Sequence, residues 1–468
     1  MKSAFTLIKG DKHNSNTDYR DALPVNMIAI NRPMFGAAGY MIQAPGLTQY
    51  ATASDIHRGG LWNERQQTLF RVAGTELITV ADDGTVAVLG TIPGTDLAVM
   101  PYSFNTQAII ANGQYFLYDP VNGFREVLDV DLGSPIDAVW VDNYYFFTDG
   151  AFLYHTDITD ESSIDPLKFA TSEYSPDPTV GLGLTADNKV VAFNRYSIEY
   201  FVNQATDNFA FQRIATRAIK AGLVGTHCKC ELENHFVIMG GAKEEAVSIH
   251  IVSTGQLSKI ATREIDQVIA QYSEAQLSQA KLETVMFEGY HHVLVHLPNE
   301  TLVYNHTIAK AVGLPFAWSV WKSDVDGDTP YRAIHFAFDP RLALWTVGDK
   351  QDGRIGYLDV TVGTQYDAIV EWLLFTPFLF IENQSINSLE IETIPGFTGS
   401  DDATVFISLT YDGITYGQEN TRLYGRPNDY GQRFTAYRLG YVRDWFGLKL
   451  RGASLSRMAF ARGLIDHG

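Results

Sequence analysis

The most constraining feature of this sequence is a repeated strand pattern. At least six times between about residues 50 and 360, alternating strands close on a turn carrying Asp, Asn or Gly, and the pattern then begins again. Clear instances are "QQTLFRVAGTELITVADDGTVAVLG", "TQAIIANGQYFLYDPVNGFREVL" and "KVVAFNRYSIEYFVNQATDNFAFQRI". A period of roughly 40 to 50 residues is that of four-stranded propeller blades, each of which buries its faces against its neighbours. The repeat predicts an all-β chain containing a β-propeller of six or seven blades.

The length of the chain predicts more than one domain. Its 468 residues exceed the roughly 250 to 300 at which a single core stops growing. After about residue 365 the short repeats give way to longer strands such as "TVFISLTYDGITYGQE". We therefore expect an N-terminal arm or partial blade (1–50), the propeller (51–365) and a C-terminal β-sandwich (366–468). Ser273 followed by Gln276 forms a capping box, which predicts a short helical insertion near residues 272–282.

The charge balance limits the possible partners. Lys and Arg number 35 against 54 Asp and Glu, for a net charge of −19. Such a surface repels phosphate, so ordinary groove reading of nucleic acid is disfavoured. Apolar runs are too short for a signal-peptide core or a membrane span. With Cys228 and Cys230 as the only cysteines, we expect a soluble protein without disulfides, made in a cytoplasm.

Two short motifs contain potential metal ligands. In "GYHHVLVHLP", strand alternation places His292 and His296 on one face, with His291 on the other. A zinc site needs further converging ligands, so we interpret these residues as strand-surface histidines. Cys228 and Cys230 lack a second pair of ligands, and we interpret them as reduced, partly buried thiols.

The acidic loop Asp324–Pro330 resembles the start of a calcium loop, because Asp324, Asp326 and Asp328 alternate. The twelfth position is His335, where a bidentate Glu is required, and Pro330 stiffens the loop. A solvated turn is therefore the favoured interpretation. The sequence predicts no metal site and no cofactor.

The segment "TYDGITYG" resembles the Asp-box turn of sialidase propellers, with Asp412 and Gly413 at its tip. A glycosidase also needs two carboxylates at matched separation, or a Tyr nucleophile with an Arg cluster. The Arg residues are scattered singly, so a simple hairpin turn is favoured and no catalytic residue is assigned. We predict that the chain is not an enzyme. The alternative is a carbohydrate-active or glycan-binding, sialidase-like propeller, which clustered Arg and acidic side chains at the axial face would favour.

Six collinear segments carry a resemblance to a known family. They are "DYRDALPVNM", "RYSIEYF", "IKAGLVGTHCKCELENHFVIM", "HHVLVHLPNETLVYN", "VGTQYDAIVEWLLFTPFLF" and "LTYDGITYGQE". In this order, from residue 18 to residue 419, they resemble the tail hub, or packaged-DNA stabilisation protein, of short-tailed, enterobacterial-type podophages. The following "GRPNDYGQRFTAYRLGYVRDWFGLKLRG" resembles the family only loosely.

The resemblance implies a structural role in the virion. It implies a homo-hexameric tail hub or nozzle that connects the portal-adaptor ring to the tail needle, with tailspike or fibre proteins as further partners. Such a hub retains the packaged DNA and forms the channel for genome ejection, without sequence-specific DNA binding or membrane insertion. The expected location is the phage tail, assembled in the cytoplasm of the host bacterium.

Two segments are candidates for contacts between subunits or with partners. Aromatic residues are favoured at interfaces, which singles out Trp445 and Phe446 in "YVRDWFGLKL", although burial in the core explains them equally well. The second segment is "DYRDALPVNM", an extended arm that can add to a neighbour's sheet edge or close the propeller within its own subunit. Its candidate residues are Tyr19, Leu23, Pro24, Val25 and Asn26.

Overall fold

The computed structural model describes residues 2–8, 10–13, 19–34, 36–253, 255–394, 403–427, 429, 431 and 433–468. The chain divides into two compact units. Unit 1 contains residues 1–49, 286–332 and 357–468, and unit 2 contains residues 50–285 and 333–356. In the part of the chain that the structure describes, no helix is long and apolar enough to cross a membrane.

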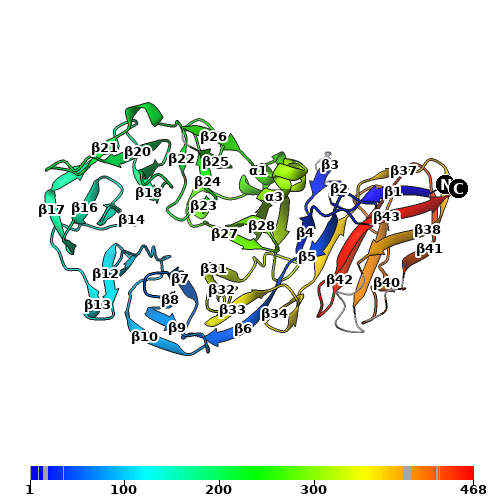
Figure 1. Ribbon diagram of the computed structural model, residues 1–468. Coiled ribbons are helices and arrows are strands. Elements are labelled where there is room, and N and C mark those ends of the chain that lie inside the picture. The colour runs from blue at the N-terminus through cyan, green and yellow to red at the C-terminus, as the bar shows by residue number, and fades with distance from the viewer. Residues whose placement is uncertain are drawn as a thin grey trace. The chain divides into compact units, whose positions relative to one another are not determined.

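Unit 2 is built from consecutive antiparallel sheets, mostly with strands in meander order (Figure 1). The first sheet contains β7 (His57–Asn63), β8 (Thr68–Ala73), β9 (Glu76–Val80) and β10 (Val86–Thr91). The second contains β11 (Gln107–Ala111), β12 (Gln114–Asp119) and β13 (Gly123–Glu126). The third contains β14 (Asp137–Val141), β15 (Tyr144–Thr148), β16 (Leu153–Asp157) and β17 (Asp160–Ala170).

Two more sheets continue the series. The fourth contains β18 (Thr179–Leu184), β19 (Val190–Asn194), β20 (Ile198–Asn203) and β21 (Phe211–Arg213), followed by the 3-10 helix η1 (Ala215–Arg217). The fifth contains β22 (Gly222–Leu223), β23 (Lys229–Leu232), β24 (His235–Gly241), β25 (Ser248–Ser253) and β26 (Gln256–Lys259). Repeated sheets of this kind are propeller blades, so the predicted β-propeller is confirmed.

The blades form because their turns match strand twist. Asn112 and Gly113 join β11 to β12, and Asp142 and Asn143 join β14 to β15, all with positive φ. Two-residue turns with positive φ at both positions have the twist that antiparallel strands require. Each turn sets the register, as in the pairing of Ala111 with Gln114.

Neighbouring blades bury one another's faces. Phe70 of the first sheet and Phe116 of the second lie in one core cluster. Tyr115 of the second contacts Phe147 of the third, with 4.9 Å between ring centroids. The remaining strands of unit 2 include β31 (Ala333–Asp339) and β32 (Leu344–Asp349), and Ala337 packs with Trp62 of the first sheet. The first blade is thereby covered by residues distant in sequence.

Two short helices of unit 2 follow β26. They are α1 (Arg263–Ile269) and α2 (Glu274–Leu277). The predicted capping box is present, because Ser273 Oγ accepts a hydrogen bond from Gln276 N while Gln276 Oε1 accepts one from Ser273 N. Strand β27 (Lys281–Phe287) comes next.

Two sheets of unit 1 form the C-terminal β-sandwich. One contains β4 (Met27–Ile30), β5 (Tyr40–Gln43), β43 (Ala459–His467), β38 (Gln384–Thr393) and β41 (Phe434–Val442), with β1 (Lys2–Thr6) also paired to β43. The other contains β36 (Trp372–Phe375), β42 (Trp445–Ala453), β39 (Thr404–Thr410), β40 (Asn420–Leu423) and β37 (Leu379–Phe380). The two sheets contact each other through the rings of Trp372 and Phe460, whose centroids are 5.0 Å apart. The predicted sandwich is confirmed.

The N-terminal strands belong to this sandwich. Five residues of β1 pair with β43, and β5 pairs with the start of the same strand. Phe5 and Leu7 are buried. The sequence pattern does not anticipate this long-range pairing.

The rest of unit 1 consists of shorter elements. Strands β28 (Tyr290–His296), β29 (Thr301–Asn305) and β30 (Trp318–Trp321) pair in succession. Strands β2 (Gly10–His13) and β3 (Tyr19–Ala22) form a hairpin, and β34 (Thr364–Gln365) pairs with β35 (Ala368–Ile369). The helices are α3 (His306–Ala311) and η2 (Leu314–Phe316). Strands β6 (Gly46–Thr52) and β33 (Arg354–Asp359) run across unit boundaries.

Candidate functional site

The first strands of several blades line a cavity in unit 2. Its volume is about 680 Å³, and the blades contribute Leu61, the β14 residues from Asp137 to Trp140, and the β18 residues from Leu182 to Leu184. Further lining residues with polar side chains are His227, Lys229, Cys230, Glu231 and Lys281. Ligand sites are concave and carry a few placed polar groups. The contacts of the charged side chains in this cavity therefore indicate whether it is a binding site.

One carboxylate at this cavity joins three blades. Asp137 is buried, and its Oδ2 accepts a hydrogen bond from Leu182 N at 2.7 Å. The same oxygen lies 2.6 Å from Lys229 Nζ, which also donates to Thr226 O at 2.8 Å. The charge of Asp137 is thus neutralised inside the protein, where an unpaired carboxylate would be strongly unfavourable.

A second carboxylate binds an irregular part of β31. Glu283 accepts hydrogen bonds from His335 N at 2.9 Å and from Phe336 N at 3.2 Å. These amides are exposed to it because the ladder shifts register between Ile334 and Ala337, where His335 has a φ of 58°. Lys281 forms an ion pair with Glu283 at 3.0 Å and contacts His335 Nδ1. The bulge therefore holds a buried ion pair.

A buried arginine links β8 to the same bulge. Arg71 has no exposed surface and donates to His335 O at 3.2 Å and to Thr346 Oγ1 at 2.9 Å. Burial lowers the pKa of Lys350 to about 7, lowers that of Lys281, and holds that of His335 well below its usual value. Burial is the first cause in each case.

Arg and acidic side chains do cluster near the axis, which is the feature that would favour a glycan-active propeller. Their contacts point to another role. Asp137, Glu283 and Arg71 are engaged with backbone amides, a backbone carbonyl and neighbouring charges within the chain. Such an arrangement stabilises closure of the ring of blades. Sequence patterns missed these residues, although a charge inside an apolar strand, as in "LFRVAG", is a usable signal.

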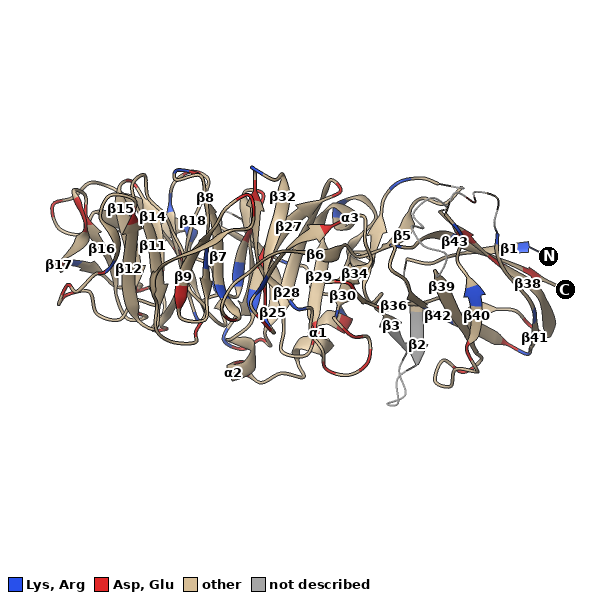
Figure 2. Cartoon of the chain, turned by 90° about the horizontal axis from the view of Figure 1, so that it is seen from below, with Lys and Arg blue, Asp and Glu red and all other residues tan. Residues whose placement is uncertain are grey.

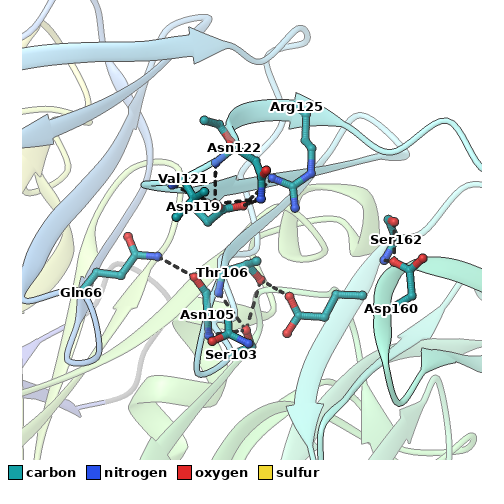
Figure 3. A network of polar contacts seen from close by, with 12 residues as sticks. Gln66, Ser103, Asn105, Thr106, Asp119, Val121, Asn122, Arg125, Asp160 and Ser162 are labelled. Carbon is teal, nitrogen blue, oxygen red and sulfur yellow. Dashed lines mark hydrogen bonds and ion pairs between the residues drawn. The ribbon is translucent and has the colours of Figure 1, made fainter.

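A second polar network joins the first three blades (Figure 3). Gln66 Nε2 donates to Asn105 O at 3.2 Å. Thr106 Oγ1 donates to Glu161 Oε2 at 2.7 Å and contacts Tyr145 OH at 2.8 Å. Nearby, desolvation raises the pKa of Asp119, but hydrogen bonds from Asn122 and Arg125 outweigh it and lower that pKa to about 2. Polar contacts therefore fasten one blade to the next.

The histidine motif is buried, so its interpretation as a strand-surface feature is wrong. His292 and His296 both lie in the core, and burial lowers the pKa of His292 to about 3. The ring of His292 stacks on Phe287 at 4.2 Å. His296 Nδ1 lies 3.3 Å from Thr301 Oγ1. His291 is half-buried.

The two cysteines and the acidic loop are described by their burial and hydrogen bonds. Among the residues that the structure describes, no group of three His, Cys, Asp or Glu is placed to hold an ion. Cys228 is buried and Cys230 half-buried, both are unbridged, and burial raises the pKa of each thiol to about 12. In the loop, Asp324 Oδ1 accepts from Asp326 N at 3.1 Å. The interpretations as thiols and as a turn are confirmed.

The Asp-box-like segment is a hairpin turn after β39. Asp412 Oδ1 accepts hydrogen bonds from Ile414 N and Thr415 N, each at 2.8 Å. The hydrogen bond from Thr415 is the largest cause that lowers the pKa of Asp412 to about 2. The carboxylate therefore stabilises the turn, in agreement with the interpretation of this segment as a simple hairpin turn.

The predicted contact residues lie in different environments. Trp445 is half-exposed and packs on Phe380 with 5.1 Å between ring centroids, whereas Phe446 is fully buried. Tyr19 begins β3. Pro24 and Asn26 are buried, while Leu23 and Val25 are half-buried.

The main chain of this N-terminal segment bonds within its own unit. Val25 N donates to Leu373 O at 3.0 Å, and Asn26 N donates to Val320 O at 2.8 Å. Their role as contacts with other subunits stays a prediction.

The fold is a β-propeller with a β-sandwich, and charged side chains inside the propeller bind one another. Such a fold does not by itself define a function. Comparison with known proteins gives the family. The model described as "Bacteriophage P22 Gp10, beta-propeller" matches residues 3–363, and "Bacteriophage P22 Gp10, beta-sandwich" matches residues 371–468. The chain belongs to this family of phage tail hub proteins. It is 30% identical over 466 residues to the "Tail hub protein gp10" of Salmonella phage P22, covering 95% of each chain.

The likeness to solved structures is more distant. The Neurospora crassa Pan2 WD40 domain is 7% identical with a TM-score of 0.42, over 68% of this chain and 96% of that one. Virginiamycin B lyase from Staphylococcus aureus is 11% identical with a TM-score of 0.43, over 68% of this chain and 99% of that one. Family membership confirms the prediction of a structural, non-enzymatic phage tail protein.

Proposed function

We propose that the chain is a homo-hexameric tail hub that connects the portal-adaptor ring to the tail needle and keeps packaged DNA in the capsid until ejection. The observation that carries this proposal is the match to a tail hub over 95% of both chains, spanning propeller and sandwich together. A shared role in assembly is favoured by such collinear similarity, because both domains are retained in the same order. Tailspike or fibre proteins are further proposed partners.

The charge of the chain supports a role at a DNA channel. Each copy carries a net charge of −19, and six copies carry 6 × −19 = −114. If part of this charge faces the lumen, the wall repels the phosphate backbone and DNA slides past without adhering. Rigid blades fastened by buried ion pairs suit a ring that resists the pressure of packaged DNA.

Particles made without the chain test the proposed retention of DNA. Capsids should package the genome but lose it, because the exit is not closed. The measurement is DNA protected from nuclease, in particles with and without the chain, with restoration by added purified protein as the control. Full retention by particles that lack the chain would contradict the proposal.

The proposed ring and its adaptor contact need a second measurement. The purified chain, alone and mixed with portal-adaptor complex, is examined by light scattering and negative-stain imaging. Six-fold rings, either free or only on the adaptor, are the expected result, since docking can supply the local concentration that assembly needs. A chain that stays monomeric and does not bind the adaptor would contradict it.

A further inference from the structure

The third blade of unit 2 and the segment that leads into it from β13 expose several large apolar side chains. Val130, Leu167 and Leu128 are 94%, 81% and 80% exposed. Phe152 and Phe169 are also exposed, and their rings contact each other edge to face at 5.2 Å. Contiguous exposed apolar side chains mark interaction sites on soluble proteins.

Phe152 and Phe169 line a groove of about 200 Å³ beside the outer strand of the blade, and Val130 and Leu167 are next in sequence to its lining residues Asp131 and Pro166. We call it the β17 groove. Its apolar lining includes Leu132, Phe152, Tyr154, Ile164 and Phe169. Its polar lining is Asp131, Asp149 and Asp165. A groove with an apolar floor and carboxylates around it fits an apolar or aromatic side chain flanked by a positive charge.

The geometry of β17 favours insertion of a side chain over addition of a strand. The strand is last in its sheet, and its pairing with β16 is irregular, with register shifts on both sides of Thr156. Pro166 lies in its middle and has no amide hydrogen to offer a neighbouring strand. Edge strands protected in this way do not extend a sheet, so recognition falls to the groove.

The surroundings of the groove are strongly acidic. Residues 128–174 contain ten Asp and Glu against the single Lys168, and of the ten only Asp137 is buried and paired with Lys229 at the inner cavity. In Figure 2, segments coloured red for Asp and Glu lie on the loops near β16 and β17. A partner must therefore supply basic residues, because an acidic or neutral one leaves this charge uncompensated.

The chain itself carries a surface of the complementary chemistry, at the turn between β41 and β42. Arg443 is 87% exposed and lies 3.8 Å from its neighbour Asp444, which is also exposed. Tyr441 and Trp445 flank it, and their exposed fractions are 59% and 50%. Residues 433–451 contain five Lys and Arg against Asp444 alone. Trp, Tyr and Arg are the residues that most often dominate binding energy at interfaces.

We propose that the β17 groove of one copy receives the β41–β42 turn of a second copy, with Trp445 against the apolar floor and Arg443 beside the carboxylates. The two surfaces are different, so the contact is heterologous and repeats from copy to copy until a ring closes. This inference rests on the ring of the proposed function and assigns the surfaces that form it.

Cross-linking in assembled tails tests the pairing. Leu167→Cys and Trp445→Cys are introduced together, both at exposed sites, and purified tails are treated with a short bismaleimide. A ladder from dimer to hexamer is expected on a denaturing gel. Either single variant should remain monomeric, because each copy then lacks one of the two thiols. Cys228 and Cys230 provide little background, since burial raises the pKa of both thiols.

A matched control moves one thiol to another blade. Val88 is 58% exposed on β10, the outer strand of the first blade, and Val88→Cys with Trp445→Cys should give no ladder. Dimers from Leu167→Cys alone would reveal a two-fold contact and overturn the proposal. Intact tails without a ladder from the double variant would also overturn it, while leaving the proposed function untouched. Absence of the chain from tails would instead contradict the proposed function.

Charge reversal tests the polar half of the contact. Arg443→Glu and Asp131→Arg change exposed residues, and each should lower association of purified subunits on adaptor complexes by about tenfold at low salt. The two changes in one chain should restore most of this loss, because each new charge then meets its opposite. Losses that simply add in the double variant would contradict the pairing.

Discussion

At the residue scale, the chain places several charged side chains in its interior and bonds them to backbone groups that are distant in sequence. Arg71, Glu283 and Asp137 illustrate this, because each is bonded to the backbone of another strand. Removing one member of such a pair is costly, since the remaining group stays buried without its partner.

One prediction concerns pH. The pKa of His292 is lowered by burial to about 3, whereas an unfolded histidine has a pKa near 6.5. The contribution of His292 to stability is therefore fully present above about pH 6.5. It is lost as the pH falls from about 6.5 towards 3, because protons bind the unfolded chain first. His292→Phe should remove about 2 kcal/mol of the stability lost between pH 7 and pH 5. Urea unfolding followed by tryptophan fluorescence at both pH values measures this.

The stacking partner supplies the control for this prediction. Phe287→Leu alters the same packing contact without removing a titratable group, so its cost should be similar at pH 7 and pH 5. An identical pH dependence in wild type and His292→Phe would show that His292 does not contribute to acid sensitivity.

At the element scale, packing between neighbouring strands can depend on a small residue that leaves room for a large side chain. Gly452 of β42 lies opposite Trp372 of β36. An added Cβ at Gly452 would lie 2.1 Å from the indole of Trp372. The glycine is needed because a large aromatic ring covers the strand at this point.

The second prediction is that Gly452→Ala lowers the free energy of unfolding of the sandwich by about 3 kcal/mol, through overpacking against Trp372. Gly417→Ala is the matched control, because its nearest contact is Leu409 O at 3.6 Å, and we expect a change within about 0.5 kcal/mol. Near-ultraviolet circular dichroism during urea unfolding reports both. Equal stability of the two variants would exclude tight packing of Trp372 on this strand.

At the scale of the whole molecule, strands from both ends of the chain complete one domain. Strand β43 pairs with β38 on one side, and with β1 and β5 on the other. A sandwich defined only by its C-terminal sequence therefore leaves one edge of β43 uncovered. Exposed edges of this kind promote aggregation.

The third prediction follows for fragments of the chain. Residues 366–468 alone should aggregate or remain partly unfolded, whereas the same segment joined through a linker to residues 1–49 should fold. Circular dichroism and amide proton dispersion in nuclear magnetic resonance spectra distinguish the two. A stably folded, monomeric 366–468 fragment would show that β1, β4 and β5 are dispensable.

Much of the fold follows from short-range patterns. Alternation with period two and turn pairs such as Asn112–Gly113 predict the hairpins, and their repetition predicts the propeller. The Ser273 cap and the Asp412 turn are also predictable, because each motif bonds to residues at most three positions away. Such features need no information about distant parts of the chain.

Alternation does not reveal which faces become covered. Trp445 and Phe446 are adjacent, yet one is half-exposed and the other buried, because neighbouring strand residues point to opposite faces. For the same reason the motif around His292 resembles a surface pattern in the sequence, although His292 is buried and stacks on Phe287 in the folded chain. Burial is a property of two packed layers, and a single strand carries only half of that information.

What the sequence by itself determined was the local grammar: strands, turns, a cap, the acidic balance and the order of propeller and sandwich. Tertiary structure alone decided which distant residues meet, such as Arg71 with the bulge at His335, β1 with β43, and the carboxylates that converge on the β17 groove. The physical reason is range. Turn and strand preferences act over a few residues, whereas burial and charge pairing depend on positions that only the folded chain brings together.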